Sequence, residues 1–533
     1  MALAGTILGT IADLRAFTGA ADAASVLGYY AAGDSGGGDF VWNATLNTAD
    51  NGGTIIKPTA SSGAGRWVRL LPQADTVDVR MFGAKGDGVT DDHAAITAAI
   101  AVLPTGGTLI FPNGTYAISS TVVVDAAGTA RHSLNFKGIG NDLTQPLIAC
   151  DTASTTLFDV SIPRTSWQGL RFQGDGATYG VGATTTAISF ASAGQKDVDA
   201  LITGCGFGYH AICIRSAGTN IQIWENTFSN SIVGIDVMPP TGSSNPDECR
   251  GNRIERNRFH SLGGNSTDTS VADSVCVRID TPDAYANTIS ANYADDSKAF
   301  FKGQIDRSSL DDNRYLRAWG RFADITYSGS GWSISNNMID GQNTIAAAPS
   351  TAVQSEGILT TKGVSAGRIC GNTIHVVRRN GIQCLGSFNL VSGNVIFRAN
   401  AASTYDGSIY DGLRVAGIAN TVTGNSVHNG GLAGSTGNVG IEIDSDAAQT
   451  VMGVNQVSGY VTPVADGDAT TRGFAISFTN GARRMIWDTA IPTTGTWRQG
   501  DVVWNIAPTT GAAAGWTCTA SGSPGSWTTI ATL

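Results

Sequence analysis

Acidic, aromatic and basic residues are concentrated between positions 283 and 325, in the stretch DAYANTISANYADDSKAFFKGQIDRSSLDDNRYLRAWGRFADI. Two neighbouring carboxylates can divide proton transfer, one acting as general acid and the other as base or nucleophile. Aromatic rings and arginines beside them suit a groove that holds sugar rings. We therefore expect the acid and base to come from Asp295, Asp296, Asp306, Asp311 and Asp312. The expected substrate contacts are Tyr293, Arg314, Tyr315, Arg317 and Trp319.

Other titratable residues offer alternatives to this stretch. The acidic candidates elsewhere are Glu225, Asp247, Glu248, Glu255 and Glu356. Two histidines near arginines, His260 and His375, are candidates for abstracting a proton beside a uronate, which is lyase chemistry. The sequence contains no CxxC pair and no acidic loop of the EF-hand type, so we expect neither a metal nor a cofactor.

A repeating fold must position these side chains, because an asparagine recurs just before a short β-type run throughout residues 125–480. The recurring residues are Asn226, Asn257, Asn287, Asn336, Asn372, Asn394, Asn425 and Asn455, with Asn313 as an additional member. A period of about 20–50 residues indicates a solenoid, and short β runs without helical periodicity indicate a β-helix. Equal positions on neighbouring coils lie about 5 Å apart. If Asn287 and Asn313 are equivalent, Asp280 and Asp306 stack in this way.

Composition restricts the class of protein further. Of the 533 residues, 68 are glycine, 14% are charged and 42% are hydrophobic, which excludes a disordered chain and a coiled coil. The net charge of −10 argues against nucleic acid as the partner. We find no signal peptide and no apolar run long enough to span a membrane, so no membrane partner is expected. The eight cysteines are isolated along the chain, as expected for free thiols made in a reducing cytoplasm.

Local composition divides the chain into four blocks. Residues 1–72 contain short β segments and predict a small β module. Residues 73–124 predict a cap helix that ends before Pro104 and the start of the β-helix, and residues 125–480 predict the remaining coils with the substrate groove. Residues 481–533 hold five of the eleven tryptophans and predict a second β module, for trimerisation or carbohydrate binding.

One long motif carries a family resemblance. The segment VRMFGAKGDGVTDDHAAITAAI, followed by GGTLIFPNGTY, resembles the opening of the pectate-lyase-like superfamily in its phage-tailspike branch. The FVW and GRWVR segments of residues 1–72 are similar to tailspike particle-binding modules. The resemblance implies an all-β chain, namely a right-handed single-stranded parallel β-helix with small terminal β modules.

The resemblance also implies a function. It suggests an endo-glycosidase that depolymerises a bacterial surface polysaccharide, either capsule or O-antigen. It further implies a parallel homotrimer whose N-terminal module attaches to the phage tail or baseplate, located on the virion and acting outside the host cell. A polysaccharide lyase acting by β-elimination and a receptor-binding fibre without catalytic activity remain the alternatives.

Overall fold

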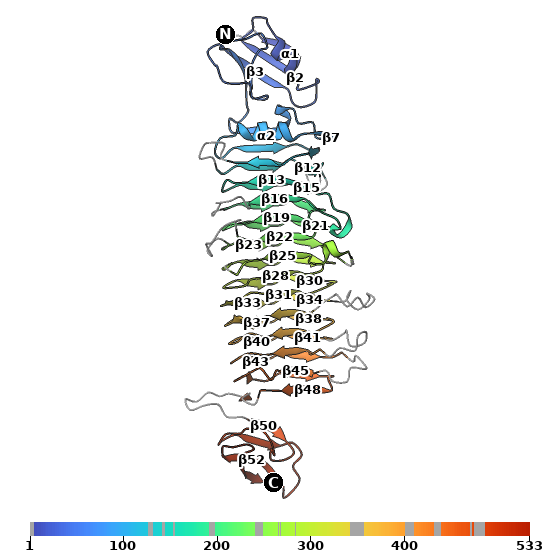
Figure 1. Cartoon of the computed structure of the whole chain (residues 1–533), viewed down its shortest axis with the longest axis vertical. Coiled ribbons are helices and arrows are strands. Elements are labelled where there is room, and N and C mark those ends of the chain that lie inside the picture. The colour runs from blue at the N-terminus through green and yellow to red at the C-terminus, as the bar shows by residue number, and fades with distance from the viewer. Residues whose placement is uncertain are drawn as a thin grey trace. The chain divides into compact units, whose positions relative to one another are not determined.

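The computed structural model describes residues 5–125, 132–140, 144–152, 155–190, 198–239, 249–264, 266, 268–282, 284–341, 356–399, 410–430, 439–468, 472–473 and 485–533. The chain divides into two compact units, Met1–Asp280 and Thr281–Leu533. Figure 1 shows the order of their helices and strands along the chain.

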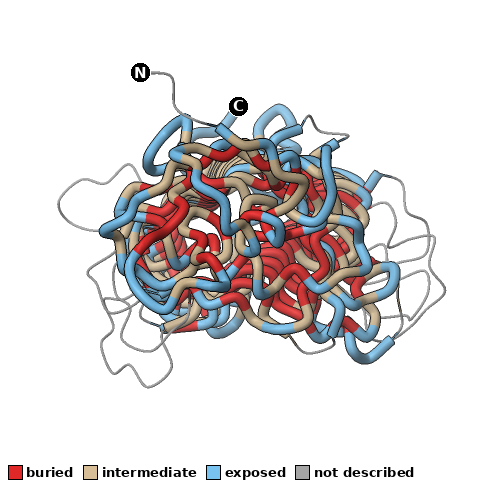
Figure 2. Tube along the Cα trace, turned by 90° about the horizontal axis from the view of Figure 1, so that it is seen from above, coloured by how far each residue is buried: buried red, intermediate tan, exposed pale blue. Residues whose placement is uncertain are grey.

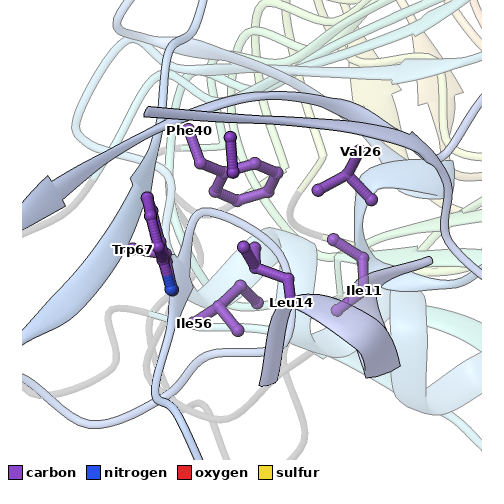
Figure 3. Close-up of a cluster of buried hydrophobic side chains, with 7 residues drawn as sticks. Ile11, Leu14, Val26, Phe40, Ile56 and Trp67 are labelled. Atoms are coloured by element: carbon purple, nitrogen blue, oxygen red, sulfur yellow. The ribbon is translucent and has the colours of Figure 1, made fainter. Parts of the chain in front are cut away.

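Unit 1 begins with a small β module built on one sheet. The strand order is β1-β2-β3-β5-β4, with β1 (Gly5–Thr10) parallel to β2 (Ala23–Gly28) and the other pairs antiparallel. The remaining elements are β3 (Gly38–Asn43), β4 (Ile55–Ile56), β5 (Arg66–Arg69) and helix α1 (Ile11–Ala16). Figure 3 shows the hydrophobic core between helix and sheet, formed by Ile11, Leu14, Val26, Phe40, Ile56 and Trp67.

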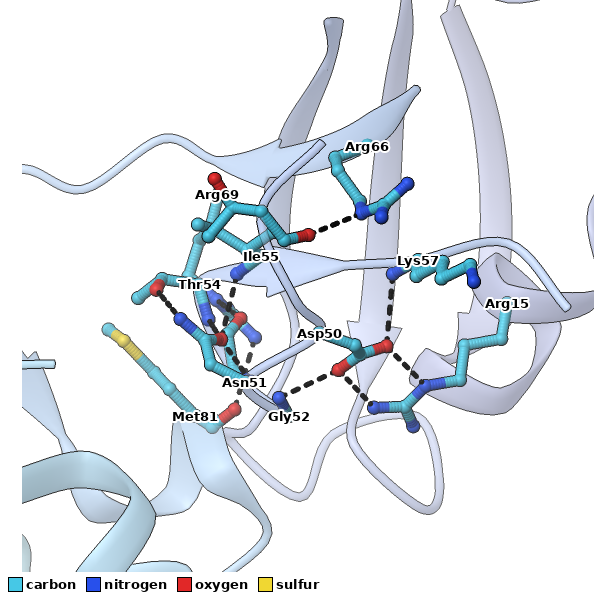
Figure 4. Close-up of polar contacts among 12 residues, drawn as sticks. Arg15, Asp50, Asn51, Gly52, Thr54, Ile55, Lys57, Arg66, Arg69 and Met81 are labelled. Carbon is cyan, nitrogen blue, oxygen red and sulfur yellow. Dashed lines mark hydrogen bonds and ion pairs between the residues drawn. The ribbon is translucent and has the colours of Figure 1, made fainter. Parts of the chain in front are cut away.

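Polar contacts fix the loops of this module (Figure 4). The Asp50 carboxylate accepts bonds from Arg15 at 3.0 and 3.1 Å and from the amide of Lys57 at 2.9 Å. Burial would raise the pKa of Asp50, but these hydrogen bonds outweigh it and lower the pKa. The buried Arg69 guanidinium donates to the carbonyl oxygens of Gly53 at 2.9 Å and Met81 at 3.4 Å. Arg69 therefore connects the module to the first coil that follows.

From residue 76, unit 1 winds into coils, each of which contributes strands to three parallel sheets. Sheet one contains β6 (Thr76–Asp78), β8 (Thr108–Phe111), β11 (Asn135–Gly138), β14 (Ser166–Gln168), β17 (Leu201–Thr203), β20 (Gln222–Trp224) and β23 (Arg253–Glu255). Sheet two contains β7 (Asp87–Asp91), β9 (Thr115–Ile118), β12 (Leu147–Cys150), β15 (Arg171–Gln173), β18 (Gly206–Gly208), β21 (Thr227–Ser229) and β24 (Arg258–His260). Sheet three contains β10 (Val122–Val124), β13 (Thr156–Val160), β16 (Thr186–Phe190), β19 (Ile212–Ser216), β22 (Val233–Val237) and β25 (Val275–Ile279).

Short helices accompany these coils. Helix α2 (His93–Ala101) follows β7 and contacts β10, at the start of the coils where the sequence predicts a cap helix. The 3-10 helices are η1 (Val79–Phe82), η2 (Thr178–Gly180) and η4 (Thr269–Val271). Inside the coils, the rings of Phe172, Phe207, Phe228 and Phe259 stack at centroid distances of 5.0, 5.1 and 4.8 Å. Repeating one residue type at one register position therefore builds a continuous core, visible as the buried interior in Figure 2.

Unit 2 contains coils of the same kind. Its strands of sheet one are β26 (Thr288–Ser290), β29 (Ser309–Asp311), β33 (Ser333–Ser335), β37 (Arg368–Cys370), β40 (Leu390–Ser392), β43 (Thr421–Thr423), β46 (Val451–Met452) and β49 (Arg472–Gly473). Those of sheet two are β27 (Tyr293–Asp295), β30 (Arg314–Leu316), β34 (Met338–Asp340), β38 (Thr373–His375), β41 (Val395–Phe397), β44 (Ser426–His428) and β47 (Gln456–Ser458). Those of sheet three are β28 (Phe301–Gly303), β31 (Ala323–Ile325), β35 (Ile358–Thr360), β39 (Ile382–Cys384), β42 (Leu413–Val415), β45 (Val439–Ile443) and β48 (Thr462–Asp466). A separate pair joins β32 (Gly329–Ser330) to β36 (Val364–Ser365).

The predicted parallel β-helix is thus confirmed, but the asparagine register needs a correction. The buried ladder in unit 2 runs through Asn292, Asn313, Asn337, Asn372, Asn394, Asn425 and Asn455, each side-chain oxygen accepting the amide of the preceding member at 2.9–3.1 Å. Asn287 instead lies at another corner, where its amide donates to Ser308 at 3.0 Å. Asn336 occupies a turn position with a φ of 56°, immediately before the ladder residue Asn337. The predicted stacking of Asp280 on Asp306 is therefore wrong, and Asp306 pairs with Tyr285.

A second β module ends unit 2. Its sheet has the order β50 (Met485–Asp488), β51 (Val502–Asn505), β52 (Ala513–Ala520) and β53 (Ser526–Thr532). The core is formed by Trp497, Val503 and Cys518, with Trp516 and Trp527 packed against it. All eight cysteines of the chain are free thiols, as the sequence predicts.

Candidate functional site

The structure distributes the predicted catalytic residues over three corners of the coil in unit 2. We name each corner by the two sheets that it joins. Asp306 precedes sheet one at corner 3–1, whereas Asp311 ends β29 and Asp312 follows it at corner 1–2. Asp295 and Asp296 lie at corner 2–3, where β27 ends. The five aspartates therefore do not form one site.

The residues at the first two corners make contacts between coils. The Asp306 carboxylate accepts the amide of Ser330 at 2.7 Å. Asp311 accepts the hydroxyl of Ser333 and the amide of Ser335, both at 3.1 Å. Asp312 is exposed with a φ of 57°, a conformation that aspartate and asparagine tolerate at tight turns. The structural role of these three aspartates is therefore to stabilise neighbouring coils and the turn between two strands.

Corner 2–3 brings together most of the other predicted residues. Arg317 forms an ion pair with Asp295, and this hydrogen bond raises the pKa of the guanidinium. The indole Nε1 of Trp319 donates to Asp296 at 2.5 Å. On the adjoining strands, Tyr293 of β27 lies opposite Arg314 of β30. Charged and aromatic side chains from two successive coils therefore meet at the start of this corner.

Tyr315 does not join them. Its side chain is fully buried inside the coil, and its hydroxyl donates to the carbonyl oxygen of Ser297 at 2.6 Å. The central residue of a three-residue strand such as β30 points inward, because successive side chains alternate between the two faces. The expected contact between Tyr315 and a substrate is thus contradicted by its burial.

The same corner continues as a polar stripe through the following coils. We use the name corner 2–3 stripe for Asp295, Asp296, Arg317, Trp319, Arg321, Glu356, Arg379, Asn380, Tyr410 and Asp411 at this corner, together with Asp324, Arg414 and Glu442 on the sheet-three strands that follow it and Asp444 directly after β45. Arg321 donates to Asp324 and to Glu356, both at 2.7 Å, and Arg379 donates to Glu356 at 3.3 Å. Burial would raise the pKa of Glu356, but the bond from Arg321 outweighs it and lowers the pKa. Glu356 is therefore held as an ion.

The next coils carry a pair of interacting carboxyl groups. The guanidinium of Arg379 lies 5.3 Å from the ring centroid of Tyr410, and the amide of Asp411 donates to Asn380 at 2.6 Å. Asp411 is 5% exposed, and its carboxylate accepts the backbone amide of Val439 at 3.3 Å. Burial, followed by hydrogen bonding with the Glu442 side chain and the negative charge of Glu442, raises the pKa of Asp411 to about 8. Asp411 is therefore a carboxylic acid that keeps its proton near neutral pH.

Arginine contacts distinguish Glu442 from Asp411. Arg414 lies 3.4 Å from Glu442 and donates to Asp444 at 2.6 and 3.1 Å. Glu442 lies opposite Arg414 in the pairing of β42 with β45. A protonated carboxyl group beside an arginine-paired carboxylate is the arrangement needed for one general acid and one base or nucleophile.

Sequence reasoning missed this pair, although a signal was present. The strands of sheet three share the pattern Gly–Ile or Leu–X, at GIL (357–359), GIQ (381–383), GLR (412–414) and GIE (440–442). The X residues lie in one column, in which Leu359, Gln383, Arg414 and Glu442 are paired in register. Aligning the coils on this glycine would have placed Glu442 beside Arg414.

The other candidates lie in different places. Glu225 forms an exposed ion pair with Arg256 at 3.1 Å, Glu255 ends β23, and His260 ends β24. The Nδ1 atom of His375 lies 3.5 Å from Asp340, and its ring stacks on Phe397 at 5.3 Å. Asp247 and Glu248 lie outside the described residues.

Two further observations concern the described part of the chain. It contains no group of three or more histidine, cysteine, aspartate or glutamate side chains arranged to hold a metal ion. Within the same residues, no helix has the length and hydropathy that crossing a bilayer requires.

Comparison with known proteins gives two family matches. Residues 7–72 match the phage tail protein small four-stranded beta-sheet domain. Residues 76–356 match the family described as rhamnogalacturonase A/epimerase, pectate lyase-like.

Individual proteins are similar over smaller regions or at low identity. The non-secreted LysM effector LysM19 of Penicillium expansum is 36% identical over 104 residues, which is 15% of this chain and 8% of that protein. The Dettilon tailspike protein has 16% identity and a TM-score of 0.45, covering 75% of this chain and 70% of that one. The PL6 family alginate lyase AlyGC has 14% identity and a TM-score of 0.47, covering 74% and 53%.

The family matches agree with the architecture. The match at residues 76–356 extends over more than half of the 533 residues and coincides with stacked parallel coils. The match at residues 7–72 coincides with the N-terminal sheet, so both resemblances noted in the sequence are confirmed. The chain belongs to the rhamnogalacturonase A/epimerase, pectate lyase-like family and carries a phage tail β-sheet domain at its N-terminal side.

Proposed function

We propose that the chain is a phage tailspike that binds a bacterial surface polysaccharide, capsule or O-antigen, and cleaves it by endo-glycosidic hydrolysis. The observation that carries the proposal is the Asp411–Glu442 carboxyl pair on the corner 2–3 stripe. The phage tail domain at residues 7–72 supports the assignment to a tail, and the family match supports a carbohydrate as substrate.

The two carboxyl groups take different roles. Asp411 donates its proton to the glycosidic oxygen, and the bond from that oxygen to the anomeric carbon breaks with its electrons moving to the oxygen. Glu442, paired with Arg414, either attacks the anomeric carbon to form a glycosyl ester that water then hydrolyses, or activates the water molecule that attacks this carbon. The separation of two such carboxyl groups decides the stereochemical outcome, with about 5–5.5 Å giving retention and about 6.5–9.5 Å giving inversion of configuration.

The rest of the stripe suits the binding of a polymer. From β28 to β45 the corner advances five coils, or about 24 Å at the spacing of neighbouring strands. Tyr293, Arg314, Arg317 and Trp319 lie at the beginning of this path, and we propose that they contact the polysaccharide. Sugar rings stack on aromatic side chains, while arginines donate to hydroxyl groups.

The proposal is tested with purified capsular and O-antigen polysaccharides. Size-exclusion chromatography of the products should show shorter chains with new reducing ends for the wild-type protein and intact polymer for Asp411→Asn. Binding without any loss of polymer size would identify a non-catalytic receptor-binding fibre and overturn the enzymatic assignment.

One observation favours a lyase as the second candidate. His375 lies beside Asp340, and Arg378 and Arg379 follow it in the chain. Such a histidine could abstract a proton next to a uronate carboxylate. A lyase would give products with an unsaturated sugar, detected by ultraviolet absorbance, and would lose activity in His375→Gln rather than in Asp411→Asn.

The assembly is proposed on the same basis. We propose a parallel homotrimer on the virion, attached to the tail or baseplate through the N-terminal module and acting outside the host cell. The C-terminal module, residues 481–533 in the sequence division, would serve trimerisation or carbohydrate binding; its Trp487 is 57% exposed. Light scattering that gives the mass of a monomer would contradict the trimer.

A further inference from the structure

Tyr460 lies buried at corner 2–3, one coil beyond Glu442. It follows β47, and its side chain is 7% exposed. Its hydroxyl group has no hydrogen-bond partner within the described residues. A buried donor without a partner destabilises the folded state, and such groups in native proteins call for an explanation.

Two glycines determine where the tyrosine ring lies. A β-carbon placed on Gly440 would lie 3.2 Å from Cδ2 of Tyr460, and one placed on Gly412 would lie 2.8 Å from its hydroxyl oxygen. The ring therefore passes along the glycine column of sheet three, and its hydroxyl group reaches the residue that follows Asp411. A larger residue at position 412 would displace the hydroxyl group.

The hydroxyl group of Tyr460 lies close to the charged groups that interact with Asp411. Asp411 interacts with Glu442, with Arg414 and with Tyr460. Burial, followed by the negative charge of Asp411, raises the pKa of Tyr460, so the phenol keeps its proton. The hydroxyl group is thus available as a donor close to Asp411.

We propose that Tyr460 is a positioning residue that hydrogen-bonds the Asp411 carboxylate formed when Asp411 gives its proton to the glycosidic oxygen. This inference rests on the proposed hydrolysis. Before the reaction, the Asp411 carboxyl group interacts with that of Glu442, and the phenol hydroxyl has no partner in the part of the chain that the structure describes. As Asp411 becomes an anion, the donor gains a partner while keeping its own proton. The interaction is therefore stronger in the transition state than in the ground state, which accelerates the reaction.

Tyr460→Phe separates this role from a structural one. The variant keeps the ring against the two glycines and removes only the hydroxyl group. We expect kcat to fall about tenfold with KM unchanged. The thermal midpoint should stay equal or rise, because the folded state loses an unpaired buried hydroxyl group. A merely structural tyrosine would give the opposite pattern, with a lower midpoint and unchanged kcat. Tyr285→Phe, at corner 3–1, is the matched control and should leave kcat unchanged.

A titration that needs no substrate completes the test. Infrared difference spectra of the protonated carboxyl band, assigned with Asp411→Asn, report the pKa of Asp411 directly. Because the hydroxyl group stabilises the carboxylate, Tyr460→Phe should raise the pKa of Asp411 and move the alkaline limb of the rate profile to higher pH. An unchanged titration overturns the inference. Loss of polymer cleavage in Asp411→Asn together with wild-type rates in Tyr460→Phe would overturn it while leaving the proposed hydrolysis standing.

Discussion

Replacing Asp411 with asparagine tests whether Asp411 is the general acid of the proposed hydrolysis. With its pKa raised to about 8, Asp411 is mostly protonated at pH 7. An aspartate with the ordinary pKa would be protonated in only about one molecule in a thousand. General acid catalysis contributes about 10²–10⁴-fold, so Asp411→Asn should lower kcat/KM by a factor in this range. The wild-type rate should also decline as the pH rises through about 8.

The same substitution has a predicted effect on stability. A folded-state pKa above the ordinary value means that the folded protein binds a proton that the unfolded chain has already released. Between about pH 4 and pH 8, stability therefore falls as the pH rises, by at most about 1.4 kcal/mol per pH unit. Asp411→Asn removes this proton, so its thermal midpoint should vary less with pH than that of the wild type. At pH 8 the variant should be the more stable protein.

The assay combines polysaccharide cleavage at several pH values with thermal scans at pH 5 and pH 8. Asp312→Asn is the matched control, because Asp312 lies at corner 1–2 in a turn conformation that asparagine also adopts. It should retain wild-type activity and the wild-type dependence of stability on pH. Near-normal cleavage by Asp411→Asn, or loss of cleavage in Asp312→Asn, would refute the reasoning from the stripe.

Three other substitutions give distinct outcomes. Asn313→Ala leaves the amide of Asn292 and the carbonyl of Ile289 without their partner, at a cost of about 1–3 kcal/mol for each; calorimetry should show a clearly lower thermal midpoint. Tyr315→Phe removes a bond inside the coil and should cost about 1 kcal/mol while KM stays unchanged; a raised KM would restore Tyr315 as a substrate contact. Trp319→Ala should raise KM several-fold with little change in kcat in steady-state assays, and an unchanged KM would exclude Trp319 from the path of the polymer.

The coiled fold could be predicted from the sequence because each coil needs an asparagine at the same corner. Each ladder residue follows a tight corner, and its side-chain oxygen accepts the backbone amide of the equivalent residue on the preceding coil, so the same residue type returns at every turn. The register was harder to predict, because asparagine occupies two corners of one coil, as Asn287 and Asn292 do. Both are followed by short β runs, and only pairing with the next coil distinguishes them.

The candidate site was harder to predict for a related reason. The cluster at Asp295, Asp296, Arg317 and Trp319 is visible in the sequence because its two coils are short and adjacent. Asp411 and Glu442 lie on neighbouring coils, but residues 429–438 separate β44 from β45 in the sequence and obscure the register. Tyr315 was predicted as a substrate contact because it is an aromatic residue in this cluster. Its side chain points inward because it is the central residue of a strand, which its residue type does not reveal.

The most direct test of the account is a crystal structure of Asp411→Asn with a bound oligosaccharide from the polysaccharide that the wild-type protein cleaves. The sugar chain should follow corner 2–3 of unit 2, with a glycosidic oxygen within hydrogen-bond distance of residue 411 and the anomeric carbon facing Glu442. An oligosaccharide bound along corner 1–2 or corner 3–1, away from both residues, would contradict the central claim.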